Sequence, residues 1–196
     1  MIKLGITGNI GSGKSTISEF FSVLGIPVYD ADSRAKWLMN NHSDLRDGIK
    51  ALFGNESYLP DLTLNRKYIA SIVFHDKSKI EALNALVHPA VRDDFNSWAS
   101  QQNAKYILKE AALLIESNSY QDLDELILVK CPIDIRIERT MKRDAVDRSS
   151  VEARIQNQMK EEDKIPYANY FINNDGTELI IPQVLQIHHK ILEKSN

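Results

Sequence analysis

Cysteine and long apolar runs are both scarce in this sequence. Cys131 is the single cysteine, so an intrachain disulfide and a cysteine-based metal cluster are excluded. Because Cys131 follows a strand-like apolar run, we expect it to be a small packed residue rather than a nucleophile. No apolar run approaches the roughly 20 residues of a membrane-spanning helix, and no signal-peptide pattern precedes the first apolar segment. We therefore expect a cytoplasmic protein that has no membrane partner.

The sequence also has no excess of basic over acidic residues. The 196 residues include 24 Lys and Arg against 27 Asp and Glu, which gives a net charge of −3. A broad nucleic-acid-binding surface is therefore not expected, and any polyanion must be recognised locally. Internal repeats and low-complexity tracts are absent too. The hydrophobic fraction of 43% is ordinary for one globular core, or for one core with a small appended unit.

The strongest positive signal is a phosphate-binding loop. Residues 8–15, GNIGSGKS, match the pattern G-x-x-x-x-G-K-[ST], after a strand-like segment at 2–7 and before an amphipathic helix from Ser15 onward. Glycines let successive N–H groups converge on phosphate oxygens, and the helix N-terminus adds partial positive charge. Lys14 supplies a mobile cation, and the Ser15 hydroxyl is a ligand for Mg²⁺. A bare strand-to-helix turn is the alternative, while a dinucleotide fingerprint fails because Thr16 occupies its third glycine position.

The sequence therefore predicts a nucleotide-binding protein. The predicted nucleotide-binding residues of the loop are Asn9, Ile10, Gly11, Ser12, Gly13, Lys14, Ser15 and Thr16. A guanine-reading N/T-K-x-D motif and a D-x-x-G switch segment are both absent from the sequence. A signalling GTPase is therefore not expected.

Strand-like and helical patterns alternate along the chain. Short apolar strands are expected at 2–7, 26–29, 106–108, 126–130 and 171–172, with helices between them and a last helix whose start Pro182 leaves undefined. This alternation predicts an α/β fold with a five-stranded parallel sheet and helices on both faces. The stretch 33–102 is instead largely helical, which indicates an inserted helical subdomain. Its expected buried positions are Trp37, Leu38, Leu45, Ile49, Leu52 and Phe53.

Local patterns mark three further positions. His88-Pro89 is expected just before a helix, with the proline near the first turn. Ser149-x-x-Glu152 is a capping-box pattern and predicts the start of another helix. The pair His188-His189, late in the last helix, is expected to be solvated.

Carboxylates follow two of the expected strands. In parallel sheets ligands gather at the C-terminal ends of the strands, which is where Asp30, Asp32 and Glu110 fall. A carboxylate at Asp30 or Asp32 can orient an acceptor hydroxyl and take its proton, although turn-capping by aspartate is the alternative. Glu110 is placed to hold Mg²⁺ or its water shell. The alternative for Glu110 is an exposed carboxylate at a strand end.

Arginines concentrate in the segment after the fourth expected strand. Arg136, Arg139 and Arg143 are spaced to share one helix face, and Arg148 and Arg154 follow. Solvated salt bridges with neighbouring acids are the alternative for each of them. A short basic helix–loop–helix is also what a closing lid needs, because planar guanidinium groups can hold the charge of a transferring phosphoryl group.

Taken in order, these motifs resemble the dephospho-coenzyme A kinase family. The resemblance covers nearly the whole chain, and the ordered set is far more specific than the loop alone. The matching segments are TGNIGSGKST at 7–16, LG at 24–25 leading to DAD at 30–32, LVHP at 86–89, LLIE at 113–116, RTMKRD at 139–144 and INNDG at 172–176.

The resemblance implies ATP-dependent phosphorylation of the ribose 3′-hydroxyl of dephospho-CoA, which gives coenzyme A and ADP. It implies a three-layer P-loop NTPase fold that resembles nucleoside monophosphate kinases. The implied core covers about 1–32, 103–133 and 166–196, with a helical CoA-side insertion at about 33–102 and a lid at about 134–165. We expect a monomer that uses ATP and Mg²⁺ on this small-molecule substrate.

The resemblance also implies roles for individual residues. Asp32 is the base or hydroxyl-positioning residue, and Arg139 acts at the transferring phosphate. The implied sets are Lys14, Asp32 and Arg139 as catalytic residues, Arg143 with the loop at the nucleotide, Asp30, Asp32 and His88 at the substrate, and Ser15 and Glu110 at Mg²⁺.

Two positions depart from the family pattern. Ala112 stands where members usually carry proline, and Glu110 stands where many members place aspartate. The longer side chain of Glu110 leaves open whether it ligates Mg²⁺ directly. Another small-molecule or nucleoside monophosphate kinase is the alternative enzyme, and a nucleotide-dependent switch without transfer activity is an alternative of a different class.

Overall fold

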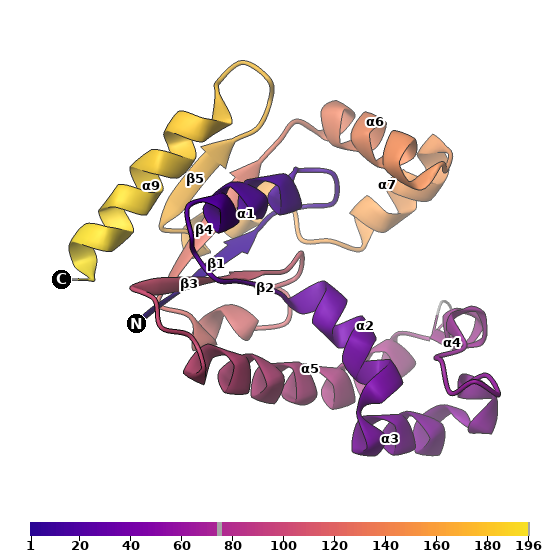
Figure 1. The fold of residues 1–196 in the computed structure, drawn as a ribbon. Coiled ribbons are helices and arrows are strands. Elements are labelled where there is room, and N and C mark those ends of the chain that lie inside the picture. Colours follow the sequence, from indigo (N-terminus) through magenta and orange to yellow (C-terminus); the bar gives the residue numbers. More distant parts are fainter. Residues whose placement is uncertain (74–75, 196) are drawn as a thin grey trace. The chain divides into compact units, whose positions relative to one another are not determined.

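A computed structural model describes residues 1–73 and 76–195, and its sheet confirms the predicted α/β fold. All strand pairs are parallel, and the strand order is β2-β3-β1-β4-β5 (Figure 1). The strands are β1 (Ile2–Thr7), β2 (Val28–Asp30), β3 (Tyr106–Glu110), β4 (Glu125–Lys130) and β5 (Tyr170–Asn173). All five residues of β3 are buried, as expected for a parallel strand covered on both faces.

The described chain divides into two compact units. The first unit is Met1–Asp30 with Gln102–Asn196, and the second is Ala31–Gln101. The helices of the first unit are α1 (Lys14–Val23), α6 (Ile133–Asp144), α7 (Arg148–Gln156), α8 (Glu161–Lys164) and α9 (Ile180–Lys194). Those of the second unit are α2 (Ala31–Asn41), α3 (Ser43–Phe53), α4 (Arg66–Val73) and α5 (Lys77–Ser100). Short 3-10 turns at Asn55–Ser57, Ser119–Asp122 and Ile165–Tyr167 complete the regular structure.

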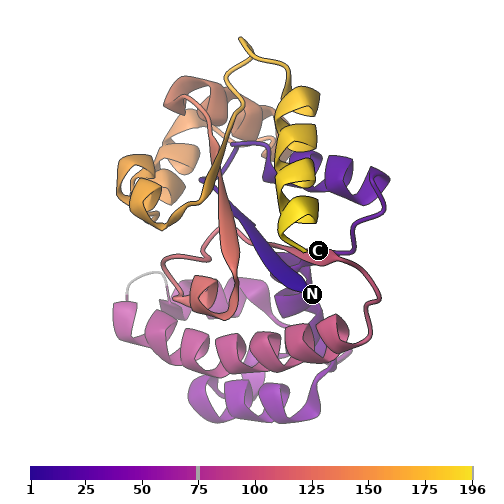
Figure 2. The same ribbon diagram turned by 90° about the vertical axis from the view of Figure 1, so that its left-hand side faces the viewer.

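Helices α1 and α9 pack against the same hydrophobic core of the sheet (Figure 2). Ile17 and Phe21 of α1 and Val184 and Ile187 of α9 are buried with side chains of β1, β3, β4 and β5, and Val28 of β2 packs against this core. The Phe21 ring meets the Tyr106 ring edge-on, with centroids 6.5 Å apart. Because burying one such side chain contributes about 1.5–3 kcal/mol, this layer fixes where α1 begins relative to β1.

The second unit has its own core, in which α2 and α3 pack on α5. The buried side chains include four of the six predicted ones, namely Leu38, Leu45, Ile49 and Phe53. The predictions for Trp37 and Leu52 are wrong, since these side chains are 49% and 39% exposed. Each precedes a buried neighbour, Leu38 or Phe53, by one position, which on a helix is a rotation of about 100° away from the core. The Arg34 guanidinium covers part of the exposed Trp37 ring at 4.4 Å.

Helix α5 runs through Pro89, so the expectation of a helix start at His88-Pro89 is wrong. The helix begins twelve positions earlier, where the Asp76 carboxylate accepts hydrogen bonds from the N–H groups of Ser78 and Lys79 at 2.9 and 3.4 Å. An interior proline removes one backbone hydrogen bond, here to the carbonyl four positions back. Packing of α5 against α2, α3 and α4 offsets that loss.

Helix α7 begins at Arg148, and its cap is Asp147 rather than the predicted Ser149. The Asp147 carboxylate accepts the Ser150 N–H at 2.7 Å and the Ser149 hydroxyl at 2.9 Å. A charged acceptor is favoured over a hydroxyl at the positive end of a helix. Glu152, the other half of the predicted box, pairs instead with Arg148 at 2.7 Å.

Two remaining sequence predictions concern the last helix and Cys131. Helix α9 starts at Ile180, so Pro182 lies in its first turn. His188 is not simply solvated, because its Nδ1 lies 2.7 Å from the hydroxyl of the buried Tyr106. Cys131 is packed as predicted, with 3% exposure, and burial raises the pKa of its thiol. In the parts of the chain that are described, no helix is long and apolar enough to span a membrane.

Candidate functional site

The phosphate loop between β1 and α1 has a shape that only glycine permits at two positions. Gly11 and Gly13 have φ values of +77° and +92°. A Cβ on Gly11 would lie 2.3 Å from the Arg136 carbonyl oxygen, and one on Gly13 would lie 2.2 Å from the Asn174 side-chain nitrogen. Helix α6 and the end of β5 therefore press directly on the loop.

The N-terminus of α1 opens into this loop. The first helical hydrogen bond runs from the Ile17 N–H to the Gly13 carbonyl at 3.2 Å. The N–H groups of Lys14, Ser15 and Thr16 lie in the first turn of α1 and therefore have no hydrogen-bond acceptor within the helix. The Lys14 side chain is only 9% exposed, and its ammonium donates to the Gly8 carbonyl at 2.8 Å. Together these groups form a compact concentration of donors and positive charge that suits a phosphate.

The two residues predicted to hold Mg²⁺ lie together beside the loop. The Ser15 hydroxyl donates to Glu110 Oε1 at 2.7 Å. Glu110 is 8% exposed, so the alternative of an exposed strand-end carboxylate is wrong. In the sheet register Asp30 pairs with Glu110, which pairs with Ile6 on its other side. The end of β2 thus lies at the same sheet edge as the Ser15–Glu110 pair.

Arg139 reaches the loop from α6. Its guanidinium donates to the Asn174 carbonyl at 3.3 Å and to Asn174 Oδ1 at 3.4 Å. Its Nη1 lies 3.8 Å from the position that a Cβ on Gly13 would take. Arg139 therefore presents an exposed cation next to the donor-rich loop, where a planar guanidinium can bind phosphate oxygens.

Arg143 lies one turn farther along α6 and makes a different contact. It pairs with Asp144 through two hydrogen bonds of 2.8 and 3.2 Å, and its side chain is 62% exposed. Arg154 binds the same carboxylate at 2.7 Å. The hydrogen bond from Arg143, followed by that from Arg154, lowers the pKa of Asp144 to about 2. The nucleotide-binding role predicted for Arg143 would require this pair to open.

Two residues that contact the loop, Asn174 and Gln158, were not predicted as site residues, and Arg136 was predicted on the wrong face of its helix. The Asn174 side chain is 7% exposed and donates to the Ser12 carbonyl at 2.7 Å. Arg136 is 6% exposed and donates to the Cys131 carbonyl at 3.0 Å, so it does not share the exposed face of Arg139. Gln158 accepts the Ile10 N–H at 2.9 Å. The NNDG motif at 173–176 was a signal for Asn174, but no local pattern marks Gln158, and the arginine spacing does not reveal that Arg136 turns inward.

The residues predicted on the acceptor side belong partly to the second unit. Asp32 lies in the first turn of α2, and His88 lies in the middle of α5. Asp30 is the last residue of β2 in the first unit. The three residues therefore come from a strand end and from two helices.

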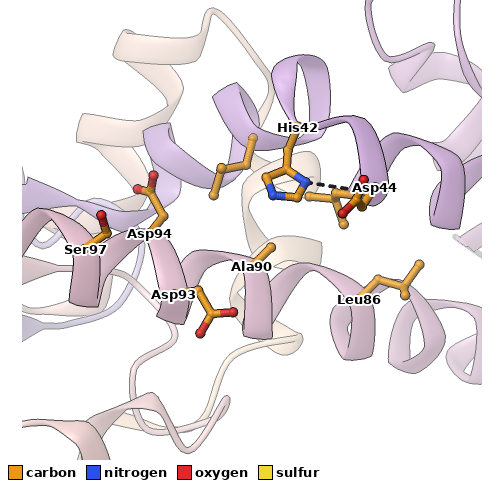
Figure 3. A pocket seen from close by; sticks show the side chains of 9 residues that line it. His42, Asp44, Leu86, Ala90, Asp93, Asp94 and Ser97 are labelled. Atoms are coloured by element: carbon orange, nitrogen blue, oxygen red, sulfur yellow. Dashed lines mark hydrogen bonds between the residues drawn. The ribbon is translucent and has the colours of Figure 1, made fainter.

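The second unit also contains a cavity of about 450 Å³ between α2, the start of α3 and α5 (Figure 3). Its apolar wall comes from leucine and alanine side chains, and Asp44, Asp93 and Asp94 stand at its polar margin. Asp94 is held by Arg34 through two hydrogen bonds of 2.9 and 2.6 Å. This acidic margin disfavours a phosphate-bearing ligand, so the donor-rich loop of the first unit is the better candidate for a nucleotide.

Comparisons with known proteins agree with one another. The dephospho-CoA kinase family model matches residues 2–179. A dephospho-CoA kinase of Bacteroides fragilis is 35% identical over 95% of this chain and 91% of its own length, and one of Porphyromonas gingivalis is 36% identical over 99% and 96%. A crystal structure of a Thermus thermophilus protein superposes with a TM-score of 0.85 at 33% identity, covering 96% of both chains. Shikimate kinase of Acinetobacter baumannii, at 13% identity and a TM-score of 0.58 over 99% of this chain and 94% of its own, shares the fold alone.

Proposed function

Because the chain belongs to the dephospho-CoA kinase family, we propose that it transfers the γ-phosphoryl group of ATP to the ribose 3′-hydroxyl of dephospho-CoA, releasing coenzyme A and ADP. Phosphorylation of dephospho-CoA, a step of coenzyme A biosynthesis, is the activity that the family match supports. The structural observation that carries the proposal is the hydrogen bond of Ser15 to the buried Glu110 carboxylate, in a loop that also contains the buried Lys14. A loop that served only as a turn would have no need of these groups.

The loop is proposed to bind the triphosphate of ATP. The residues predicted to bind the nucleotide run from Asn9 to Thr16. Of their backbone N–H groups, those of Lys14, Ser15 and Thr16 at the start of α1 would take the β- and γ-phosphate oxygens, because the Ile10 and Ser12 N–H groups already have acceptors. Lys14 would leave the Gly8 carbonyl and neutralise charge between the β- and γ-phosphates. Arg139 would stabilise the charge that spreads over the transferring phosphoryl group.

Ser15 and Glu110 fit a magnesium site. A hydroxyl and a carboxylate are hard oxygen ligands, and Mg²⁺ is usually held by one or two protein groups together with phosphates and water. The metal would supply charge neutralisation at the phosphates. The hydrogen bond of 2.7 Å between the two side chains keeps their oxygens adjacent and the Glu110 carboxylate oriented toward the loop.

Asp32 is proposed to orient the 3′-hydroxyl and to accept its proton. The hydroxyl oxygen attacks the γ-phosphorus while the bond to the ADP oxygen breaks, and the proton passes to the carboxylate. Asp30 and His88 are proposed to contact the acceptor. The helical unit at 31–101 would then bind the rest of the substrate, and the segment at about 134–165 would act as the lid. We also propose that the protein works as a cytoplasmic monomer.

An acceptor panel under one ATP-coupled assay tests this function. Purified protein with MgATP is given dephospho-CoA, AMP, CMP or shikimate, and the products are identified by mass. We expect dephospho-CoA alone to gain one phosphate group at a substantial rate. Rapid turnover of a nucleoside monophosphate without turnover of dephospho-CoA would instead identify the alternative enzyme, and slow hydrolysis that no acceptor accelerates would indicate a switch protein.

A further inference from the structure

The outer side of the phosphate loop is tied to a segment that we call the return segment, residues 158–164, which follows α7. The Ile10 N–H donates to Gln158 Oε1 at 2.9 Å. The Asn9 side-chain amide donates to the Met159 carbonyl at 3.2 Å. Two consecutive residues of the loop are thus held by two consecutive residues that lie far away in the sequence.

The return segment is itself anchored to the core. The Met159 N–H donates to Glu116 Oε1 at 3.2 Å, and the Lys164 ammonium lies 2.8 Å from the same oxygen. The Lys164 side chain is fully buried. At the end of β4, the Cys131 N–H donates to Glu161 Oε2 at 3.1 Å. Gln158 therefore approaches the loop from a fixed position.

This flank of the loop borders a cavity. The cavity has a volume of about 600 Å³, and its lining includes Asn9, Arg136, Gln158 and Met159. Helix α6 packs against the loop at Gly11. At Asn9 and Ile10, the loop is held to the return segment by its two hydrogen bonds.

The bond to Gln158 also determines which N–H groups remain for an anion. It turns the Ile10 N–H outward, and the Ser12 N–H is taken by the Asn9 carbonyl at 3.1 Å. The N–H groups at the start of α1 therefore remain available to bind one anion together. Such parallel dipoles repel one another when no anion lies between them, so a preorganised loop needs support from outside.

We propose that Gln158 is a positioning residue for the phosphate loop. By accepting the Ile10 N–H, it holds the loop in the conformation that binds the triphosphate before the nucleotide arrives. This inference rests on the proposed function, because it takes ATP to be the ligand of the loop. It predicts that loss of the Gln158 acceptor weakens nucleotide binding far more than it slows the chemical step.

The test compares Gln158→Ala with Gln158→Glu and with a matched control, Gln186→Ala. Gln186 is the same residue type and is exposed on α9, outside the lining of the cavity beside the loop. We expect Gln158→Ala to raise the KM for ATP about tenfold, the effect of losing one well-placed hydrogen bond, with kcat changed less than twofold. Gln186→Ala should match the wild type. Equal losses in kcat and in affinity, or no change in either, would overturn the proposal.

Hydrogen exchange of the Ile10 amide without nucleotide provides a readout that does not depend on activity. The amide should be protected in the wild type and in Gln158→Glu, because glutamate still offers an acceptor, and exposed in Gln158→Ala. Exchange that is the same in all three proteins would also overturn the proposal. If wild-type protein shows this protection but neither binds ATP nor phosphorylates dephospho-CoA, the proposed function fails while the positioning of the loop stands.

Discussion

The buried ion pair between Glu116 and Lys164 allows a quantitative prediction. The Lys164 ammonium is fully enclosed, and Glu116, with a side chain 19% exposed, is the carboxylate beside it at 2.8 Å. Glu116→Gln keeps nearly the same shape and can still accept the Met159 N–H. It removes the counter-charge, however, and leaves a cation inside the protein without compensation.

The cost of that change follows from the burial of the cation. Removing one partner of a buried pair typically destabilises a protein by 3–5 kcal/mol, and the partial exposure of Glu116 places the expected loss near the lower limit, at about 3 kcal/mol. For a chain of this size, each kcal/mol shifts the midpoint of thermal unfolding by about 2–4 °C. We therefore expect Glu116→Gln to lower Tm by roughly 6–12 °C.

Urea unfolding at pH 7.5 measures the loss directly, and an exposed ion pair of the same unit is the matched control. The side chains of Arg148 and Glu152 are 55% and 45% exposed, so Glu152→Gln should cost less than about 1 kcal/mol. Equal destabilisation by Glu116→Gln and Glu152→Gln would refute the reasoning, because it would mean that enclosure of Lys164 carries no electrostatic cost. Restored stability in Glu116→Gln combined with Lys164→Met would support it.

Three further predictions concern the proposed chemistry and the dependence of stability on pH. Lys14→Ala should lower kcat by about 10²–10³ in the coupled assay, and a near-normal rate would remove Lys14 from the transferring phosphate. Asp32→Asn should lower kcat by about 10²–10⁴ while calorimetric ATP affinity is kept, and an equal loss of affinity would make Asp32 a structural residue. Burial, and then the neighbouring His189, lowers the pKa of His188. The unfolded chain then binds the proton more readily, so stability should fall as the pH drops below about 6.5, and His188→Asn should flatten that slope in urea titrations at pH 5.5 and 7.5.

The phosphate loop and the sheet could be predicted because their signals are local. The strand at 2–7, the glycine spacing and the apolar face of α1 are each written within one short stretch of sequence, and the structure places them as expected. Glu110 could be placed beside Ser15 because parallel strands end at one edge of a sheet. The resemblance added the family, which the comparisons confirm.

Contacts between distant segments could not be predicted in the same way. Gln158 meets Ile10 through a side chain that no motif marks, and Arg136 turns inward although its spacing groups it with Arg139. Pro89 within α5 shows that tertiary packing can override a local signal for a helix boundary. The cap of α7 was missed because Asp147, two positions earlier, accepts both the Ser150 N–H and the Ser149 hydroxyl, so the helix starts before Ser149.

The close approach of α6 to Gly11 also limits how far the segment at about 134–165, the proposed lid, could rotate. The Arg136 carbonyl and the Thr140 hydroxyl leave no clearance for even one added carbon at Gly11, so the first two turns of α6 are immobilised with the loop. At the other end of the segment, Gln158 and Met159 are hydrogen-bonded to the same loop. If the segment acts as the proposed lid, its rotation would therefore be confined to about 141–157, between Thr140 and Gln158. Arg139 would then stay with the loop, whereas Arg143 and Arg154 would move.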